Sequence, residues 1–250
     1  MKAPVAVLMI VLITSCTNSK DNTTKTSSAN DKLALVHAAL REDVLTAEDQ
    51  KRLTPDMVIQ NLKEGNSHYI KNELTANDYT GMLKHTSNGQ YPEAFILSCI
   101  DSRVPVEEVF DKAIGDLFVG RVAGNIVDED ILGSMEYGCK VSGAKLIVVL
   151  GHESCGAIKA AIEHEKLGNI TAMLSKIKPA LEKSKDFSGE KTVEDHDYVD
   201  HVVKNNIANT IQTILIKSTV LKEMVDKHEI KIVGAYYSLE TGQVSFLNEK

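Results

Sequence analysis

Four short apolar runs constrain the fold of this chain more than any other feature. They cover residues 94–98, 117–122, 146–150 and 230–236. Stretches with a helical spacing of apolar residues lie between or after them, at residues 131–141, 157–165, 170–181 and 199–225, the last broken near Ser218. Strands that alternate with helices in this way predict a mostly parallel sheet covered on both faces. A turn at Thr241-Gly242 then predicts a last strand over residues 243–247.

Two further helices are expected before the first strand. Residues 31–41 have the spacing of an amphipathic helix. A second helix starts after Thr54, which is a good N-cap, with Pro55 in the first helical position and Gly65 near its end. The predicted fold class is therefore α/β, with a mostly parallel central β-sheet flanked by helices and an N-terminal helical arm.

Two of the predicted strands end in residues that bind metals. Cys99 directly follows the first strand, and His152 and Cys155 follow the third. Ligands of parallel sheets bind beyond the carboxyl ends of the strands. Zinc prefers thiolate and imidazole, and a catalytic zinc has three protein ligands and one open position. These three residues are therefore predicted to hold one Zn²⁺ per chain, with a disulfide between the two cysteines as the alternative. Cys139 is expected to be a buried small hydrophobe.

The motif that carries these residues resembles a known family. Cys-x-Asp-x-Arg over residues 99–103, followed about fifty residues later by His-x-x-Cys, is similar to the hallmark of the β-carbonic anhydrases. The resemblance continues through residues 121–125 and 136–137 to 234–242, and covers about residues 53–247. It implies the β-carbonic anhydrase fold and the reversible hydration of carbon dioxide to bicarbonate and a proton by a zinc-bound hydroxide.

The residues around the predicted ligands have expected roles. Asp101 would accept a hydrogen bond from the hydroxide and orient it toward carbon dioxide. Arg103 would pair with Asp101 in a bidentate ion pair that keeps the carboxylate ionised and off the metal. Gly156 follows the third ligand, where a bare backbone lets the substrate approach closely. The alternative for Asp101 and Arg103 is an ion pair with a structural role alone.

Three positions imply a subtype by resemblance. The open form of the family, with water as the fourth ligand, carries a Gln nine residues before the first Cys, and Gln90 stands there. Phe118 and Tyr137 match its two pocket aromatics. Ile96 occupies the position where the form that closes on Asp tends to carry Trp. We expect Gln90 to bind bicarbonate by a hydrogen bond, and the two aromatics to keep the pocket apolar.

Two other functions stay open at this point. Relatives with the same fold hydrolyse carbonyl sulfide or carbon disulfide, and the ligand set cannot separate them from a carbonic anhydrase. A non-catalytic exported zinc-binding protein is the other alternative, although a structural site would normally fill all four positions with protein ligands. The resemblance also implies a homodimer or homotetramer with active sites at the subunit interface.

The N-terminus differs in composition from the rest of the chain. Residues 3–13 are apolar, too few to span a bilayer but suited to a signal peptide. The small residues before Cys16 resemble a bacterial lipobox, so Cys16 is the predicted lipidation site, with a plain signal peptide as the alternative. Residues 17–30 are almost wholly polar and predict a flexible tether.

These features divide the chain into four parts. They are a signal peptide (residues 1–16), a tether (17–30), a helical arm (31–52) and a catalytic domain (53–250). The expected location is the cell envelope or periplasm, with membrane contact only through the lipid on Cys16. The net charge of −7 excludes nucleic acid as a partner, because no basic patch could displace its counterions.

Overall fold

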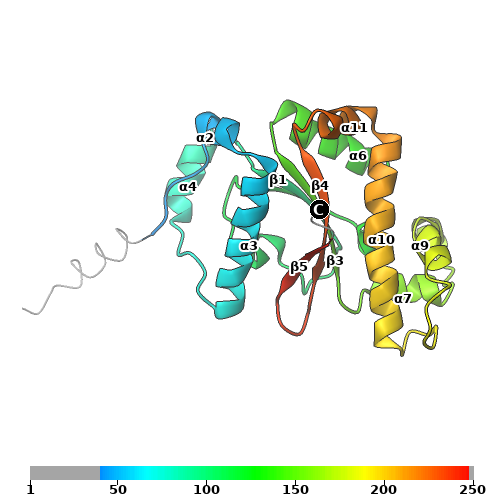
Figure 1. The fold of residues 1–250 in the computed structure, drawn as a ribbon. Coiled ribbons are helices and arrows are strands. Elements are labelled where there is room, and N and C mark those ends of the chain that lie inside the picture. The colour runs from blue at the N-terminus through cyan, green and yellow to red at the C-terminus, as the bar shows by residue number, and fades with distance from the viewer. Residues whose placement is uncertain (1–39, 248–250) are drawn as a thin grey trace, which may run out of the picture. The chain divides into compact units, whose positions relative to one another are not determined.

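The computed structural model describes residues 40–247, in which five strands form one sheet (Figure 1). They are β1 (Ala94–Ser98), β2 (Leu117–Arg121), β3 (Leu146–His152), β4 (Lys231–Tyr237) and β5 (Val244–Leu247). The strand order is β2-β1-β3-β4-β5. The first four strands are parallel, and β5 pairs antiparallel with β4. The predicted fold class and all five predicted strands are confirmed, within one or two residues at their ends.

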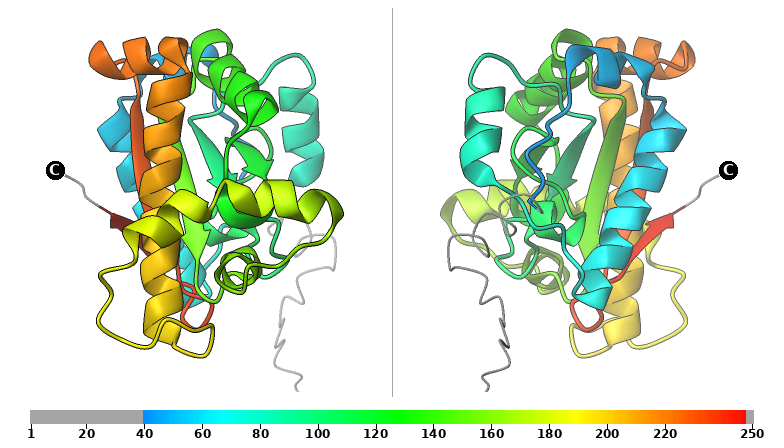
Figure 2. Two further views of the ribbon diagram at one scale, coloured as in Figure 1. Left: turned by 90° about the vertical axis from the view of Figure 1, so that its right-hand side faces the viewer. Right: turned by 90° about the vertical axis from the view of Figure 1, so that its left-hand side faces the viewer.

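Helices cover both faces of this sheet (Figure 2). Those before β3 are α2 (Ala47–Arg52), α3 (Pro55–Lys71), α4 (Tyr79–Thr86), α5 (Val106–Val109), the 3₁₀ turn η1 (Ala123–Asn125), α6 (Glu129–Glu136) and the π-helical turn η2 (Tyr137–Val141). Those after β3 are α7 (Gly156–Ile162), α8 (Gly168–Ser175), α9 (Lys178–Lys183), α10 (His196–Lys217) and α11 (Thr219–Asp226).

The alternation of side chains along β1 separates two hydrophobic cores. Phe95 and Leu97 point into the core formed with α6, α7, α9, α10 and α11. Ala94 and Ile96 point into the core formed with α3 and α5. Both faces of the central strands are therefore buried, which explains why their sequence is a continuous apolar run.

Side-chain caps mark where the two longest helices, α3 and α10, begin. The Thr54 hydroxyl accepts a hydrogen bond from the Met57 N–H, and the α3 helix ends at Asn72 with a left-handed φ of 58°. Asp195 caps α10 in the same way by accepting from the Tyr198 N–H. These caps satisfy backbone groups that a helix end leaves without partners.

The helices differ from prediction in three places. Residues 170–181 form two helices, because Pro179 lies in the first turn of α9 and has no N–H to continue α8. The helix predicted over residues 131–141 begins earlier, as α6, and its last turn is the π-helical η2. The short helices α2, α4 and α5 were not predicted. The break near Ser218 is confirmed, since α10 ends and α11 begins there.

The predicted signal peptide, tether, lipidated Cys16 and most of the first predicted helix lie outside the described residues. The division of the chain at residue 53 stays a prediction. Between residues 40 and 247, no helix has the length and apolar character needed to cross a membrane.

Candidate metal centre

Cys99, His152 and Cys155 converge at the carboxyl ends of two neighbouring strands. One ligand atom from each lies within 4.8 Å of the others, and all three side chains are buried. The two sulfur atoms are 4.0 Å apart, far beyond the roughly 2.05 Å of a disulfide bond. Both cysteines are free, so the predicted metal-ligand set is brought together as a set of independent donors.

The strand register explains the convergence. β1 and β3 are parallel neighbours with Ser98 opposite Leu150, so the residues that follow each strand meet at one edge of the sheet. β3 continues to His152, and Ser154 then turns the chain with a left-handed φ of 51°. Cys155 follows as the N-cap residue of α7. One tight turn therefore presents two of the three donors.

The imidazole of His152 is oriented for a metal. Its Nδ1–H donates to the backbone oxygen of Glu153 at 2.8 Å, which leaves the lone pair of Nε2 free. Nε2 is fully buried and has no hydrogen-bond partner among the residues that the structure describes. A buried lone pair without a donor is costly, and a metal ion at this position would satisfy it.

The two sulfur atoms also suit zinc. The hydrogen-bond contact between the two sulfurs lowers the pKa of Cys99 and raises the pKa of Cys155. Two sulfurs in a tetrahedral zinc site, each about 2.3 Å from the metal, are separated by about 3.8 Å. The observed 4.0 Å is close to this value. Two sulfurs and one imidazole nitrogen therefore fit a zinc ion.

A carboxylate lies beside this cluster and is held by an arginine. Arg103 donates from Nε to Asp101 Oδ1 at 2.9 Å and from Nη2 to Oδ2 at 2.8 Å. Its backbone N–H adds a third bond to Oδ1 at 3.0 Å. These bonds from Arg103 lower the pKa of Asp101 to about 2. Asp101 Oδ2 is 3.9 Å from His152 Nε2, so the ionised carboxylate faces the cluster.

Comparison with known proteins assigns the family. Residues 94–244 match the family model described as carbonic anhydrase. The chain belongs to the carbonic anhydrase family.

Relatives and solved structures agree with this assignment. Carbonic anhydrase 2 of Mycobacterium tuberculosis is 32% identical over 197 residues, which cover 73% of this chain and 87% of that protein. The carbonic anhydrase of Mycolicibacterium smegmatis is 32% identical, with 73% and 88% covered. A tetrameric β-carbonic anhydrase of Sordaria macrospora superposes with a TM-score of 0.61 at 21% identity, over 77% of this chain and 95% of that one. The Coccomyxa enzyme gives 0.61 at 24%, over 77% and 85%. This carbonic anhydrase therefore has the β-class fold, and zinc is its cofactor.

Arg121, which has no predicted role in the sequence pattern, organises the ligand loop of this carbonic anhydrase. Its Nε donates to the backbone oxygen of Cys99 at 3.1 Å. Its Nη2 donates to the backbone oxygens of Asp101 at 2.7 Å and Val104 at 2.9 Å. The only sequence signal was its place in the 121–125 run. The Arg121 guanidinium therefore binds three carbonyls of the loop that carries the first ligand and the Asp101–Arg103 pair.

Glu153 is a second residue without a predicted role. Its Oε2 accepts hydrogen bonds from the Ser238 hydroxyl at 3.1 Å and from the backbone N–H groups of Leu239 and Glu240 at 2.9 and 3.3 Å. These bonds fasten the turn after β4 to the residue that follows the His152 ligand.

Gln90, Phe118 and Tyr137, the three residues expected to line the pocket, lie away from the zinc ligands of the same chain. Phe118 is opposite Phe95 in the sheet, about 13 Å along the strand from Cys99 at 3.3 Å per residue. Tyr137 packs edge-on to Phe118, with 6.4 Å between ring centroids. Gln90 is exposed and precedes β1, so it too lies at the opposite end of that strand.

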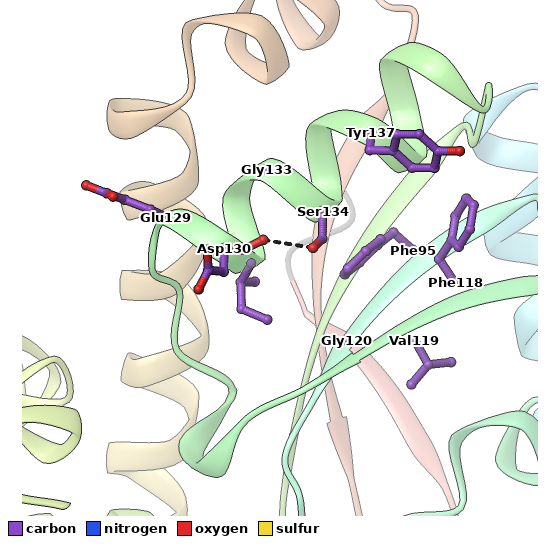
Figure 3. A pocket seen from close by; sticks show the side chains of 10 residues that line it. Phe95, Phe118, Val119, Gly120, Glu129, Asp130, Gly133, Ser134 and Tyr137 are labelled. Atoms are coloured by element: carbon purple, nitrogen blue, oxygen red, sulfur yellow. Dashed lines mark hydrogen bonds between the residues drawn. The ribbon is translucent and has the colours of Figure 1, made fainter. Parts of the chain in front are cut away.

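Figure 3 shows the two aromatic rings beside Phe95, on a cavity of about 590 Å³ between β2 and α6. Cys99, His152 and Cys155 do not line this cavity. Gly156, by contrast, adjoins the centre, since it directly follows Cys155 at the start of α7. A Cβ there would contact nothing within 4 Å, which agrees with open space in front of this backbone.

Proposed function

We propose that this carbonic anhydrase catalyses the reversible hydration of carbon dioxide at zinc held by Cys99, His152 and Cys155. The observation that carries the proposal is the convergence of these three donors beside an ionised carboxylate. When bound, zinc lowers the pKa of its water from 15.7 to about 7 and so supplies a nucleophile at neutral pH. The chain's own residues orient this nucleophile and keep the fourth coordination position free.

Asp101 orients the attacking water. Its Oδ2 is 3.9 Å from His152 Nε2, close enough to the donor cluster to accept a hydrogen bond from a water placed there. Because bonds from Arg103 lower its pKa to about 2, the carboxylate is ionised and accepts rather than donates at neutral pH. The lone pair of the water that is not engaged in this bond can then point toward carbon dioxide.

Arg103 keeps the carboxylate away from the metal. Both oxygens of Asp101 are bound by the guanidinium, in the fork geometry that gives strong and directional charge-assisted bonds. An Asp101 that left this pair could take the fourth position and exclude water. Arg103 therefore supports catalysis through Asp101, without contacting the substrate.

Stopped-flow measurement of carbon dioxide hydration tests this proposal. Zinc-loaded protein should be active, zinc-stripped protein inactive, and activity should return when zinc is restored. Arg103→Ala should retain zinc but lose most of its activity, whereas Arg52→Ala, a surface arginine paired with Glu48, should be unaffected. A zinc-loaded wild type that does not accelerate hydration would refute the function.

A second copy of the chain completes the proposed site. Gln90, Phe118 and Tyr137 lie far from the zinc ligands of their own chain, and Tyr137 is 54% exposed although it is aromatic. Phe118 lies on β2, and Tyr137 packs against it from η2. The outer edge of β2 has no strand partner among residues 40–247. A partner that docks on this edge could present these three side chains to the neighbouring zinc site as its substrate pocket.

Mixed oligomers test this arrangement. Cys155→Ser removes a zinc ligand, and Tyr137→Ala removes a pocket residue; each variant alone should be nearly inactive. When the two are unfolded together and refolded, hybrid dimers contain one zinc site lined by an intact Tyr137 from the other copy. Recovery of activity supports a shared site. Sedimentation as a monomer, or no recovery in hybrids, would contradict it.

A further inference from the structure

The side-chain amide of Asn206 on α10 is buried, although it neither fills apolar space as its neighbours do nor belongs to the proposed zinc ligands. Asn206 is 1% exposed and lies among the apolar residues through which α10 packs on the sheet. Its Nδ2 donates to the backbone oxygen of Gly124 at 2.8 Å. Its Oδ1 is buried and has no hydrogen-bond partner within the described part of the chain. A leucine would fill similar space without the cost of an unpaired polar atom, so the amide calls for another explanation.

Gly124 connects Asn206 to the metal centre through the two peptide groups on either side of its Cα. Gly124 accepts from Asn206 through its carbonyl and donates through its own N–H to Cys99 Sγ at 3.4 Å. Two hydrogen bonds joined by the Gly124 backbone therefore link Asn206 to Cys99. This link reaches Cys99, the first zinc ligand, from the helix layer of the fold, because Asn206 lies on α10.

The loop at Gly124 needs such support because its backbone is strained. Gly124 has a φ of 72°, and Asn125 follows with a φ of 41°. Two successive left-handed residues, the second of them not a glycine, persist only where the surroundings fix them. A Cβ on Gly124 would also approach Ile177 Cδ1 to 2.8 Å and Ala157 Cβ to 3.3 Å, so a side chain here would add close contacts to the unfavourable φ.

We propose that Asn206 is a positioning residue for the zinc site. By holding the Gly124 carbonyl, it restrains the φ and ψ torsions of Gly124, and through them the orientation of the Gly124 N–H that binds the Cys99 sulfur. A backbone N–H aimed at a metal-bound thiolate fixes the sulfur in place and withdraws part of its charge. Outer residues of this kind typically change metal affinity by about 10- to 100-fold when they are removed. The inference rests on the proposed function only in that Cys99 binds zinc.

Metal affinity in matched asparagine variants tests the inference. Asn206→Leu keeps the volume without the donor, and Asn206→Ser is polar but too short to reach the Gly124 carbonyl. The control is Asn66→Leu. Asn66 is also buried, and it donates to the carbonyls of Val109 and Gly242 and accepts from the Val244 N–H. It lies on α3, however, on the other face of the sheet. The zinc dissociation constant is measured by competition with a chromophoric chelator. The thiolate-to-cobalt charge-transfer absorption of cobalt-loaded protein provides a second readout.

Both Asn206 variants should bind zinc about 10- to 100-fold more weakly and shift the charge-transfer band. Asn66→Leu should lower the unfolding temperature and leave both metal readouts unchanged. If Asn206→Leu does not fold, Asn206→Ser decides the question.

A folded Asn206 variant with wild-type affinity and spectrum would overturn the inference. An equal loss of affinity in Asn66→Leu would do so too, as would the failure of both Asn206 variants to fold, which would make Asn206 a determinant of the fold. A wild type that binds no zinc would instead refute the proposed function.

Discussion

At the residue scale, the cysteines of the described chain have two kinds of surroundings. Cys99 and Cys155 face each other and the free lone pair of His152. Cys139 lies in η2 among apolar side chains, and burial raises its pKa to about 12. Cys139 belongs to no group of metal-binding side chains among residues 40–247, whereas Cys99, His152 and Cys155 form one in which a bound metal can stabilise the thiolates.

This difference predicts the result of two substitutions. Cys155→Ser should lose both zinc and activity, because serine replaces a soft sulfur donor in a set of only three. Cys139→Ala should keep about one zinc per chain and its activity, at a cost of about 1 kcal/mol or less in stability. Metal analysis together with hydration kinetics checks both. Loss of metal from Cys139→Ala with retention in Cys155→Ser would mean that the ligands are wrongly assigned.

The sequence could predict the ligands but not the residues that support them. Cys99, His152 and Cys155 follow apolar strands, so their meeting at one sheet edge follows from the pattern. Arg121 and Asn206 bind backbone carbonyls, which every residue has, so no pairing of side chains marks them in the sequence. Their roles depend on register and on the helix layer, which only the folded chain specifies.

At the scale of secondary structure elements, the contact of α3 with the end of α5 depends on a residue without a side chain. A Cβ on Gly65 would lie 1.8 Å from the backbone oxygen of Phe110. Gly133, on the exposed face of α6, has nothing within 4 Å of such an atom. Both glycines are inside helices, so they form a matched pair.

Gly65→Ala should destabilise the protein by about 1–3 kcal/mol, since the helices must move apart. Gly133→Ala should be neutral or stabilise it by up to about 1 kcal/mol through helix propensity alone. Urea unfolding of the two variants measures the difference. Equal stabilities would show that α3 does not pack this closely.

Asp111 lies just after α5 and binds His68 of α3 and Thr75 of the segment that follows α3. Its contribution to the stability of the protein should depend on pH. Burial alone would raise its pKa, but hydrogen bonds from His68 and Thr75 outweigh this and hold it below the usual 3.8. A carboxyl with a lowered folded-state pKa contributes stability above about pH 4, and this is lost as the pH falls through the folded-state value.

Asp111→Asn should therefore cost about 1–3 kcal/mol at pH 7 and much less at pH 3. Asparagine tolerates the left-handed φ of 49° at this position, so the backbone is not the cause. Asp226→Asn, in an exposed pair with Lys222, should change stability by less than about 1 kcal/mol. An Asp111→Asn deficit as large at pH 3 as at pH 7 would contradict the assignment to the charged carboxylate.

Strands were easier to predict than helices for a physical reason. Central strands are buried on both faces and read as continuous apolar runs, so β1 matches its predicted bounds. Helices such as α4 have a short apolar stripe and an internal Gly81, so their periodicity is weak. The split between α8 and α9 did have a signal, Pro179, which the apolar spacing on either side concealed.

At the scale of the whole molecule, sequence and fold give different kinds of information about partners. The sequence indicates Phe118 and Tyr137 as pocket residues, but it cannot show whether they serve their own chain or a neighbour. The distance from Phe118 to the ligands in the folded chain favours a neighbour. The N-terminal segment, in turn, is known only through its sequence.

Lipidation of Cys16 is the prediction for that segment. Wild type should fractionate with membranes and carry lipid on Cys16 as its first residue, because the small residues before it resemble a lipobox. Cys16→Ala should be released into the soluble periplasmic fraction, whereas Cys139→Ala should stay with the membrane. Cell fractionation with mass spectrometry of the mature N-terminus checks this. A soluble wild type with an intact, unmodified leader would contradict the proposal.

The central claim is that three strand-end residues hold zinc while Arg103 keeps Asp101 off the metal. A crystal structure of the zinc-loaded protein at about pH 8, with anomalous scattering to locate the metal, tests it most directly. We expect zinc bound by Cys99 Sγ, Cys155 Sγ and His152 Nε2, with Asp101 still paired to Arg103 and water in the fourth position. An Asp101 oxygen about 2.0 Å from the zinc in place of that water would contradict it.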